Sequence, residues 1–303
     1  LYVPFSGLGL YGGYRGKRWL KNRIQVFKQF VVPSLLAQTS KNFTLWISWR
    51  HEERTNPLVK ELKEYLDTIQ EFKTVFTYSG VCFWDDKYPA EVAQARLASA
   101  VHGSLADLFE PIGVVDYVLM TIQPSDDCYH RRMVEQIQIS FDMMPSVQAL
   151  GFSKGYVMDY RTQEIREWNP TTIPPFFTIK FPTPIFIEPW KHLNYTGPYK
   201  SHEYIGDKLT LGTIHERGFI VGTHGSNIST TFDHPFTGQR VNQEVLGEFG
   251  LSNVSKLIVP FSIRSIIFAK LPYKVKRKLR YLAGEKRWIF KPFFAMIYNI
   301  LRA

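Results

Sequence analysis

The sequence lacks the features of disulfide-rich, zinc-binding and membrane-spanning proteins. Its two cysteines, Cys82 and Cys128, are too few and too far apart for a disulfide framework, and neither belongs to a CxxC motif or a cysteine and histidine cluster. No apolar run approaches the roughly 20 residues that a helix needs to cross a bilayer. The chain also opens on a strand-like segment without a signal-peptide pattern. We therefore expect a protein of the reducing cytoplasm.

Acidic residues are fewer than basic ones, and the imbalance is confined to one end of the chain. The chain has 37 Lys and Arg residues against 27 Asp and Glu residues, which gives a net charge of +10. Residues 264–303 contain eleven basic residues and one acid, Glu285, so this segment accounts for the whole excess and residues 1–263 are neutral. Nucleic-acid binders usually carry their positive charge on the folded surface, and the neutral body disfavours that class.

Strand-like and helix-like patterns alternate through the first half of the chain. Apolar residues make up 45% of the sequence and charged residues 21%, as in an ordinary globular protein. The regular alternation predicts an α/β fold with a Rossmann-like, mostly parallel central sheet flanked by helices. The strand-like segments are residues 1–5, 43–49, 74–78 and 117–122, and the helix-like segments are residues 18–38, 57–72, 90–109 and 131–144.

The second half of the chain has a different pattern. Two short strand-like segments, residues 149–152 and 155–160, are expected to meet at a turn near residues 154–155. A proline-rich stretch follows at residues 169–189, and we interpret it as long loops laid over the edge of the sheet. A further strand is expected at residues 217–223.

Two adjacent carboxylates, Asp126 and Asp127, follow the buried strand-like run at residues 117–122 and the proline Pro124. Carboxylates at the end of a buried strand are costly unless they bind something, and ligands of open α/β sheets sit at that edge. Hard divalent cations that hold phosphates prefer carboxylate oxygens. The pair therefore predicts a metal and nucleotide site. The alternative is that the two acids cap the next helix.

Other residues at expected strand ends are candidates for the same site. Asp85 and Asp86 follow a strand and either contact a nucleotide base or sugar or cap the next helix. His224 ends a strand beside a glycine, where it is placed to complete a metal shell with the two acids. The glycine-rich residues 6–16, followed by Arg18, either approach a phosphate or form a surface loop.

Six short segments stand in an order and spacing that carry a family resemblance. They are residues 18–27 (RWLKNRIQVF), 30–39 (FVVPSLLAQT), 42–43 (NF), 125–138 (SDDCYHRRMVEQIQ), 174–176 (PPF) and 224–229 (HGSNIS). With them the chain resembles the rhamnosyltransferase family, which belongs with glycosyltransferases of the GT-A fold. The resemblance covers roughly residues 15–230.

The resemblance implies an enzyme that moves rhamnose or another hexose from a nucleotide-sugar donor, such as dTDP-rhamnose, to a hydroxyl of a glycan or lipid-linked acceptor. It also implies a divalent cation, Mn²⁺ or Mg²⁺, that bridges the donor diphosphate. The expected metal ligands are Asp126, Asp127 and His224. The expected donor-binding residues are Arg18, Arg23, Asp85, Asp86, Arg96 and Asp126.

The acceptor hydroxyl on this interpretation needs a carboxylate that deprotonates it. We expect Glu203 in this role, with Asp159 as the reserve. The alternative for Glu203 is structural, because it lies where a helix capped by Ser201 would begin, and an acid there interacts favourably with the helix dipole.

The chain departs from the family pattern at Pro124. Family members tend to read Arg-Leu-Asp-x-Asp-Asp where this chain reads Ile-Gln-Pro-Ser-Asp-Asp over residues 122–127. The first acid of the usual D-x-D is therefore missing. Metal binding then depends on Asp127 with His224, is weaker, or is replaced by basic residues.

Residues 264–303 alternate basic with bulky apolar side chains, which predicts a basic amphipathic helical tail. Such a tail suits the surface of an anionic membrane. The alternative is a packed terminal helix with a solvated basic face. Nucleic-acid binding is disfavoured because the neutral body supplies no basic groove.

The expected organisation is a GT-A-like domain at residues 1–263 and the membrane-association tail at residues 264–303. Within the domain, residues 1–145 form the nucleotide-sugar-binding half and residues 146–263 an irregular acceptor-side half. We expect a cytoplasmic enzyme, peripheral on the inner face of the membrane. Two other functions fit the sequence, namely a sugar nucleotidyltransferase and a noncatalytic adaptor that binds membranes or nucleic acid through the tail.

Overall fold

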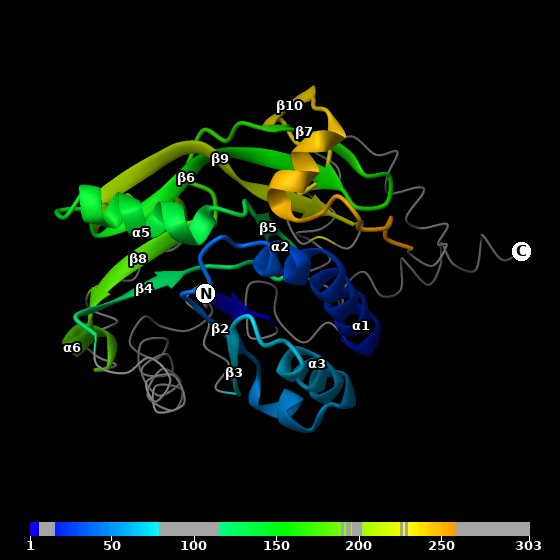
Figure 1. The fold of residues 1–303 in the computed structure, drawn as a ribbon, viewed down its shortest axis with the longest axis horizontal. Coiled ribbons are helices and arrows are strands. Elements are labelled where there is room, and N and C mark those ends of the chain that lie inside the picture. The colour runs from blue at the N-terminus through cyan, green and yellow to red at the C-terminus, as the bar shows by residue number, and fades with distance from the viewer. Residues whose placement is uncertain are drawn as a thin grey trace, which may run out of the picture.

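The computed structural model describes residues 1–5, 16–78, 115–188, 191, 195, 202–224, 227 and 230–258, and the side chains of residues 16–18, 52 and 202–204 are outside this description. The described residues form a mixed α/β fold with two sheets (Figure 1). None of the helices in this part of the chain is both long enough and apolar enough to cross a bilayer. Several predictions fall outside the described residues, namely the glycine-rich loop, Asp85, Asp86, Arg96, the helix at residues 90–109 and the tail at residues 264–303.

Three parallel strands form the first sheet, in the order β1-β2-β3. These are β1 (Tyr2–Pro4), β2 (Thr44–Ser48) and β3 (Lys73–Thr77). The 3-10 turn η3 (His51–Thr55) and the helix α3 (Pro57–Asp67) connect β2 to β3. Asn56 caps α3 because its side chain accepts a hydrogen bond from the backbone N–H of Leu58 at 3.0 Å. The expected strands are confirmed, and α3 is shorter than expected because the chain turns after residue 67 to enter β3.

A continuous helical segment packs on the first sheet. It comprises α1 (Gly16–Val26), the π-helical turn η2 (Phe27–Val31) and α2 (Val32–Leu36), and it confirms the helix expected at residues 18–38. Pro33 lies in the first turn of α2. Proline has no backbone N–H to donate, and the wider π-helical turn before Pro33 fits this interruption of the regular helical hydrogen bonds.

Seven strands form the second sheet, and most of their pairings are antiparallel. The expectation of a mostly parallel sheet is therefore confirmed for the first sheet and wrong for the second, where β6 and β9 are the parallel pair among the described strands. One cause is that β4 pairs with β8, a strand from the proline-rich stretch that we expected to form loops. The strands are β4 (Tyr117–Thr121), β5 (Cys128–Tyr129), β6 (Ala149–Asp159), β7 (Glu164–Trp168), β8 (Phe177–Pro182), β9 (Leu211–Thr223) and β10 (Thr237–Arg240).

The turn expected near residues 154–155 is wrong, since β6 runs unbroken from Ala149 to Asp159. Its pairing register with β9 shifts on both sides of Lys154, as in a β-bulge. Gly155 serves close packing rather than a turn, because an added Cβ there would lie 2.4 Å from the ring of Phe219.

The helix α5 (Met133–Met143) packs against the second sheet and confirms the helix expected at residues 131–144. Its buried Ile137 and Phe141 share one apolar cluster with Leu150 and Phe152 of β6. The remaining helical elements of the described residues are α6 (Thr183–Phe186), η4 (His202–Asp207) and η5 (Gln243–Phe249).

The two sheets meet where β1 lies beside the segment that follows β4. Tyr2 and Ile122 form an isolated parallel bridge, and the backbone N–H of Gln123 donates to the carbonyl of Tyr2 at 2.8 Å. At the end of α2, the buried Gln38 side chain donates to the carbonyl of His130 at 2.9 Å. These contacts bring the residues after β4 against α1 and α2.

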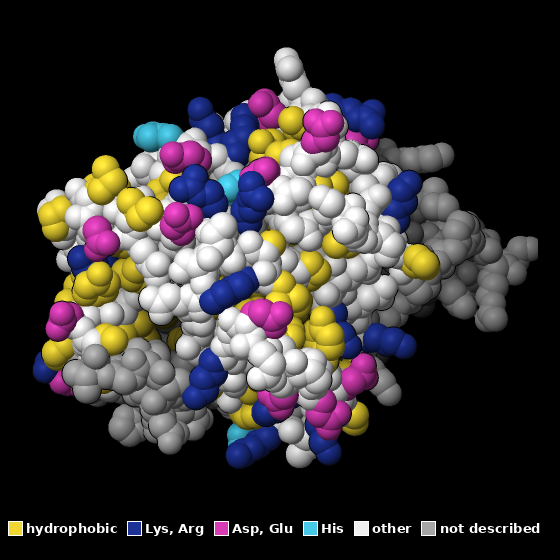
Figure 2. All heavy atoms as spheres, viewed as in Figure 1, with side chains coloured by type: hydrophobic (Ala, Val, Ile, Leu, Met, Phe, Trp, Pro, Cys, Tyr) yellow, Lys and Arg dark blue, Asp and Glu magenta, His cyan; other side chains and the backbone are white. Residues whose placement is uncertain are grey.

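Basic and acidic side chains are interspersed on the face of the molecule seen in Figure 2. Arg131 and His130 both contact the carboxylate of Glu248, at 3.0 and 3.3 Å. Arg132 contacts Glu135 at 3.0 Å. This mixture of signs agrees with the neutral balance of residues 1–263.

Candidate functional site

Asp126 and Asp127 lie in a tight turn between β4 and β5, at the junction of the two sheets. The helix-cap alternative for these acids is wrong, because α5 begins at Met133 and its N-cap position is Arg132. The residues after the two acids form β5 instead, which pairs with β9. This pairing brings the two acids beside the end of β9, away from the N-terminus of α5.

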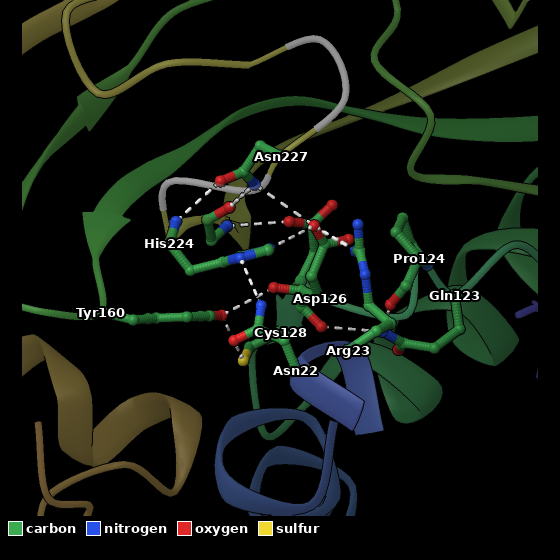
Figure 3. A network of polar contacts seen from close by, with 11 residues as sticks. Asn22, Arg23, Gln123, Pro124, Asp126, Cys128, Tyr160, His224 and Asn227 are labelled. Atoms are coloured by element: carbon green, nitrogen blue, oxygen red, sulfur yellow. Dashed lines mark hydrogen bonds and ion pairs between the residues drawn. The ribbon is translucent and has the colours of Figure 1, made fainter. Parts of the chain in front are cut away.

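The carboxylate of Asp126 is the centre of a polar network that three segments supply (Figure 3). Its Oδ2 forms an ion pair with Arg23 of α1. The same oxygen contacts Nε2 of His224 at 3.1 Å and accepts a hydrogen bond from Nδ2 of Asn227 at 3.3 Å. The side chains of Arg23 and Asp126 are 4% and 14% exposed, so two opposite charges are buried together.

The charge on Asp126 is favoured in spite of its burial. Burial raises the pKa of this carboxyl, but the Arg23 guanidinium and the hydrogen bond from His224 outweigh burial, and the pKa lies below its usual value. Charge-assisted hydrogen bonds of this kind are among the stronger ones in proteins. Asp126 is therefore an ionised carboxylate with three partners on Oδ2.

His224 directly follows β9, as the sequence predicted, and two asparagines orient it. Its backbone N–H donates to Oδ1 of Asn227 at 2.7 Å, and Asn227 also donates to the carbonyl of Gly222. On the ring, Nδ1 lies 3.4 Å from the amide nitrogen of Asn22 in α1. Because an amide nitrogen can only donate, Nδ1 accepts and Nε2 carries the proton that points to Asp126.

Burial lowers the pKa of His224 more than the hydrogen bond to Asp126 raises it. The ring is therefore neutral at pH 7. A neutral imidazole with its proton on Nε2 donates one hydrogen bond to the Asp126 carboxylate and keeps a fixed tautomer.

Asp127 contacts the end of β9. Its Oδ1 accepts a hydrogen bond from the backbone N–H of Gly222 at 2.8 Å. Burial, and then the neighbouring Asp126 carboxylate, raise the pKa of Asp127 well above its usual range, against the opposing effects of the Gly222 N–H and of Arg23. The two adjacent acids therefore differ, because the pKa of Asp126 is lowered and the pKa of Asp127 is raised.

Gly222 allows the turn and β9 to approach this closely. An added Cβ there would lie 2.2 Å from the backbone oxygen of Asp126 and 2.5 Å from the ring of Tyr160. Tyr160 itself donates to that backbone oxygen at 2.9 Å, and its ring stacks on Phe30 with 3.7 Å between the ring centroids. The stacked pair of Tyr160 and Phe30 therefore holds the main chain at Asp126 in place.

Cys128 packs against the same two aromatic residues, Tyr160 and Phe30, and has a structural role. Its Sγ lies 3.3 Å from the hydroxyl of Tyr160 and 3.4 Å from the carbonyl of Phe30. Burial is the main cause that raises the pKa of the Cys128 thiol to about 12. The thiol is therefore protonated and unreactive in the folded protein.

The side chains at this junction do not fit a divalent cation as they are arranged. In the described part of the chain, no three acidic, histidine or cysteine side chains group so as to hold a metal ion. Oδ2 of Asp126 already receives Arg23, and the proton on Nε2 of His224 occupies the nitrogen that would face a cation. Pro124 replaces the expected third acid, and its carbonyl accepts a hydrogen bond from Gln123 at 2.9 Å. The divalent cation remains a prediction.

The other predicted residues have different positions. Asp159 ends β6 and is paired in register with Thr223, next to His224, but Arg161 contacts both of its carboxylate oxygens at 3.0 and 2.8 Å. Glu203 lies in η4 and Arg18 in α1, with side chains outside the described residues. Asp85, Asp86 and Arg96 lie outside the described residues altogether.

Three residues of the network were not predicted from the sequence, namely Asn22, Asn227 and Tyr160. Asn22 and Asn227 had a local signal, since each lies within three residues of a predicted site residue and asparagine readily bonds a nearby backbone. Tyr160 had none, because its contact with Asp126 joins residues far apart in the sequence.

Comparison with known proteins finds a family match in the segment that includes Arg23. The family model described as putative rhamnosyl transferase matches residues 14–79, about a fifth of the chain. No curated protein matches. Among solved structures, residues 1–349 of S. aureus TarS align with a TM-score of 0.38 and 13% identity over 66% of this chain and 58% of that one. A TM-score of this size does not establish a shared fold.

The family match covers the helix α1 with Arg23, and it also includes β2, α3 and β3. It confirms, for these residues, the resemblance that segments 18–27, 30–39 and 42–43 carried. Residues 125–138 and 224–229, which carried the rest of the resemblance, lie beyond the match. The chain is therefore similar to the putative rhamnosyl transferases over residues 14–79.

Proposed function

We propose that this protein is a glycosyltransferase that moves a sugar from a nucleotide-sugar donor to an acceptor hydroxyl. The observation that carries the proposal is the meeting of two parts of the chain. The segment that matches the family model contributes Arg23, and Arg23 pairs with Asp126 at the end of β4 beside His224. Ligands of α/β sheets bind outside the carboxyl ends of the strands, which is where this network lies.

The donor on this proposal binds along the edge formed by the ends of β1, β2 and the segment after β4. Arg23, His224 and Asn227 hold the Asp126 carboxylate in one orientation. A polar group fixed before the ligand arrives costs no reorganisation during the reaction. This rigidity supports a binding role in a GT-A-like domain.

The reaction on this proposal is a transfer at the anomeric carbon. The bond from that carbon to the diphosphate oxygen breaks, the nucleoside diphosphate leaves with the bonding electrons, and the acceptor oxygen forms the new bond. The proton of the acceptor hydroxyl passes to a carboxylate. We propose Glu203 as this base in preference to Asp159, because Arg161 contacts both carboxylate oxygens of Asp159.

The sugar and the acceptor are finer parts of the proposal. We propose rhamnose or another hexose as the transferred sugar, because the matching family model is described as a rhamnosyl transferase. A glycan or lipid-linked acceptor at the cytoplasmic face of the membrane is proposed from the basic, aromatic composition of residues 264–303.

A thermal-shift screen of nucleotides and nucleotide sugars tests the proposed function. The panel includes dTDP-rhamnose, and each compound is measured with EDTA, Mn²⁺ or Mg²⁺. A ligand present at 100 times its dissociation constant stabilises the folded protein by about 2.7 kcal/mol, so a bound donor raises the melting temperature. The variant Asp126→Asn, compared with its own ligand-free melting temperature, is expected to lose this shift.

The result that would contradict the proposal is a panel in which no nucleotide and no nucleotide sugar shifts the melting temperature. A shift by nucleoside triphosphates with sugar 1-phosphates, without one by nucleotide sugars, would favour a nucleotidyltransferase. For a donor that does bind, release of nucleoside diphosphate in the presence of acceptor then measures transfer directly.

A further inference from the structure

The positive charge that Asp126 needs is supplied by the chain itself. Three donors converge on one oxygen of this carboxylate, namely the guanidinium of Arg23, Nε2 of His224 and Nδ2 of Asn227 (Figure 3). A guanidinium keeps its charge at all physiological pH values. The pair of Arg23 and Asp126 is therefore neutral as a whole while the carboxylate is ionised.

Arg23 is held in place on both sides. Its guanidinium carbon lies 5.2 Å from the centre of the Trp19 ring, one helical turn earlier in α1. On the other side it meets Asp126. The side chain is 4% exposed, so Arg23 has little room to leave the carboxylate without opening the junction.

Arg23 also keeps a donor that the described residues do not use. Its Nε is buried and has no hydrogen-bond partner in the described part of the chain. A guanidinium has five N–H donors in a planar fork, so it can hold Asp126 through Nη1 and still serve an anion through another nitrogen.

The remaining candidate metal ligands are engaged in the same way. His224 uses Nε2 for Asp126, and its Nδ1 lies against the Asn22 amide. Asp127 accepts from the backbone of Gly222. A divalent cation at Asp126 would have to displace Arg23 or lie beside it. A cation beside the Arg23 guanidinium would be repelled strongly, because two positive charges in contact repel each other more in a buried site than in water.

We propose that Arg23 is the cation of this site, so that it neutralises the carboxylate of Asp126 in place of a divalent metal ion and ligand binding at this junction needs no divalent cation. The part that concerns nucleotide ligands rests on the proposed function. The part that concerns metal binding by the protein alone does not.

Titration with Mn²⁺, followed by the electron paramagnetic resonance signal of the free ion, tests the proposal without any nucleotide. The full chain and Asp126→Asn are expected to bind Mn²⁺ with affinities that differ by no more than about twofold. In Arg23→Met the carboxylate loses its internal partner, and this variant is expected to bind Mn²⁺ about 10-fold more tightly than Arg23→Met/Asp126→Asn. Arg23→Lys keeps the charge and is expected to behave as the wild type.

The proposal is overturned if the wild type binds Mn²⁺ about 10-fold or more tightly than Asp126→Asn. Circular dichroism shows whether the variants fold. If Arg23→Met does not, the comparison of wild type with Asp126→Asn still decides.

A second measurement connects the proposal to ligand binding. The affinity of the wild type for a nucleoside diphosphate, measured by calorimetry, is expected to change by no more than about twofold between EDTA and Mn²⁺. A loss of about 10-fold or more in EDTA would overturn the proposal. If no nucleotide binds in either buffer, the proposed function fails, and the Mn²⁺ titration alone judges the role of Arg23.

Discussion

The two sheets of this protein differ in how their strands find their neighbours. In the first sheet, β1, β2 and β3 are parallel, and β2 and β3 lie one helix apart in the sequence. In the second sheet most pairs are antiparallel, and neighbours such as β4 and β8 are separated by more than fifty residues. The first region follows from local pattern, whereas the second depends on pairings that local pattern does not reveal. The polar network lies at their junction and takes Arg23 from one region and Asp126, His224 and Asn227 from the other.

The largest effect is expected from breaking the charge pair that joins the two regions. Arg23→Met leaves the Asp126 carboxylate buried without its cation, and removing one partner of a buried ion pair typically costs about 3–5 kcal/mol. Urea unfolding, followed by circular dichroism, measures the loss in the free energy of unfolding.

The matched control for this variant is Arg132→Met. Arg132 pairs with Glu135 on the surface, where their side chains are 51% and 36% exposed, and solvent screens such a pair, so a much smaller loss of stability is expected. Equal losses in the two variants would show that the junction pair behaves as an ordinary surface pair.

A smaller effect is expected from widening the same junction. Gly222→Ala places a Cβ 2.2 Å from the backbone oxygen of Asp126, and overpacking of this kind costs about 1–3 kcal/mol. The nucleotide-induced thermal shift is expected to decrease as well, because the turn that carries Asp126 must move.

Gly206→Ala is the control for this change. The nearest atom to its added Cβ is a Leu211 methyl carbon at 3.4 Å, which is ordinary contact, so a change within about 0.5 kcal/mol is expected. A Gly222→Ala protein as stable as Gly206→Ala would indicate that the two regions approach less closely than described.

The second region is expected to lose stability in mild acid through His130. Burial lowers the pKa of His130 more than the neighbouring Glu248 raises it. Below about pH 6.5, the usual histidine pKa, the unfolded chain binds this proton before the folded protein does. Stability is therefore full above that pH and decreases as the pH falls toward the folded pKa.

Urea unfolding at several values between pH 7 and pH 5 measures this dependence. His130→Asn is expected to flatten the slope of stability against pH. Glu248→Gln is expected to steepen it, because the group that raises the pKa of His130 is lost. If the slope of stability against pH is unchanged in both variants, His130 does not cause the loss of stability in acid.

The smallest effect concerns the thiol beneath the junction. Because burial raises the pKa of Cys128 to about 12, an alkylating reagent is expected to leave it unmodified in the folded protein. The measurement is mass spectrometry of Cys82→Ser protein, with and without denaturant. Rapid labelling of Cys128 without denaturant would show that the layer under Asp126 opens readily.

Sequence patterns predicted the elements whose apolar residues have a clear period. The helices α1, α3 and α5 and the strands β2 and β3 belong to this group. The strand β7 was missed because Glu164, Arg166 and Glu167 hide its alternation, and β8 was missed because prolines surround it. The bulge at Lys154 resembled a turn because a glycine follows it.

The candidate site divides in the same way. The sequence indicated Arg23, Asp126 and His224 from their motifs, and the structure brings the three together. It did not indicate that Arg23 and Asp126 pair with each other, because their elements lie about a hundred residues apart and only the packing of α1 against the turn after β4 joins them. The different environments of Asp126 and Asp127 likewise depend on where β9 ends.

The bridge between Tyr2 and Ile122 gives this arrangement a thermodynamic consequence. It is the β-pairing that joins the two sheets within the described residues, and Asp126 follows it by four residues. A ligand bound to this edge would contact the two regions only while they are docked, so binding and docking share one equilibrium. By mass action such a ligand stabilises the docked state. Its dissociation constant would therefore depend on how stable the docking of the two regions is without the ligand.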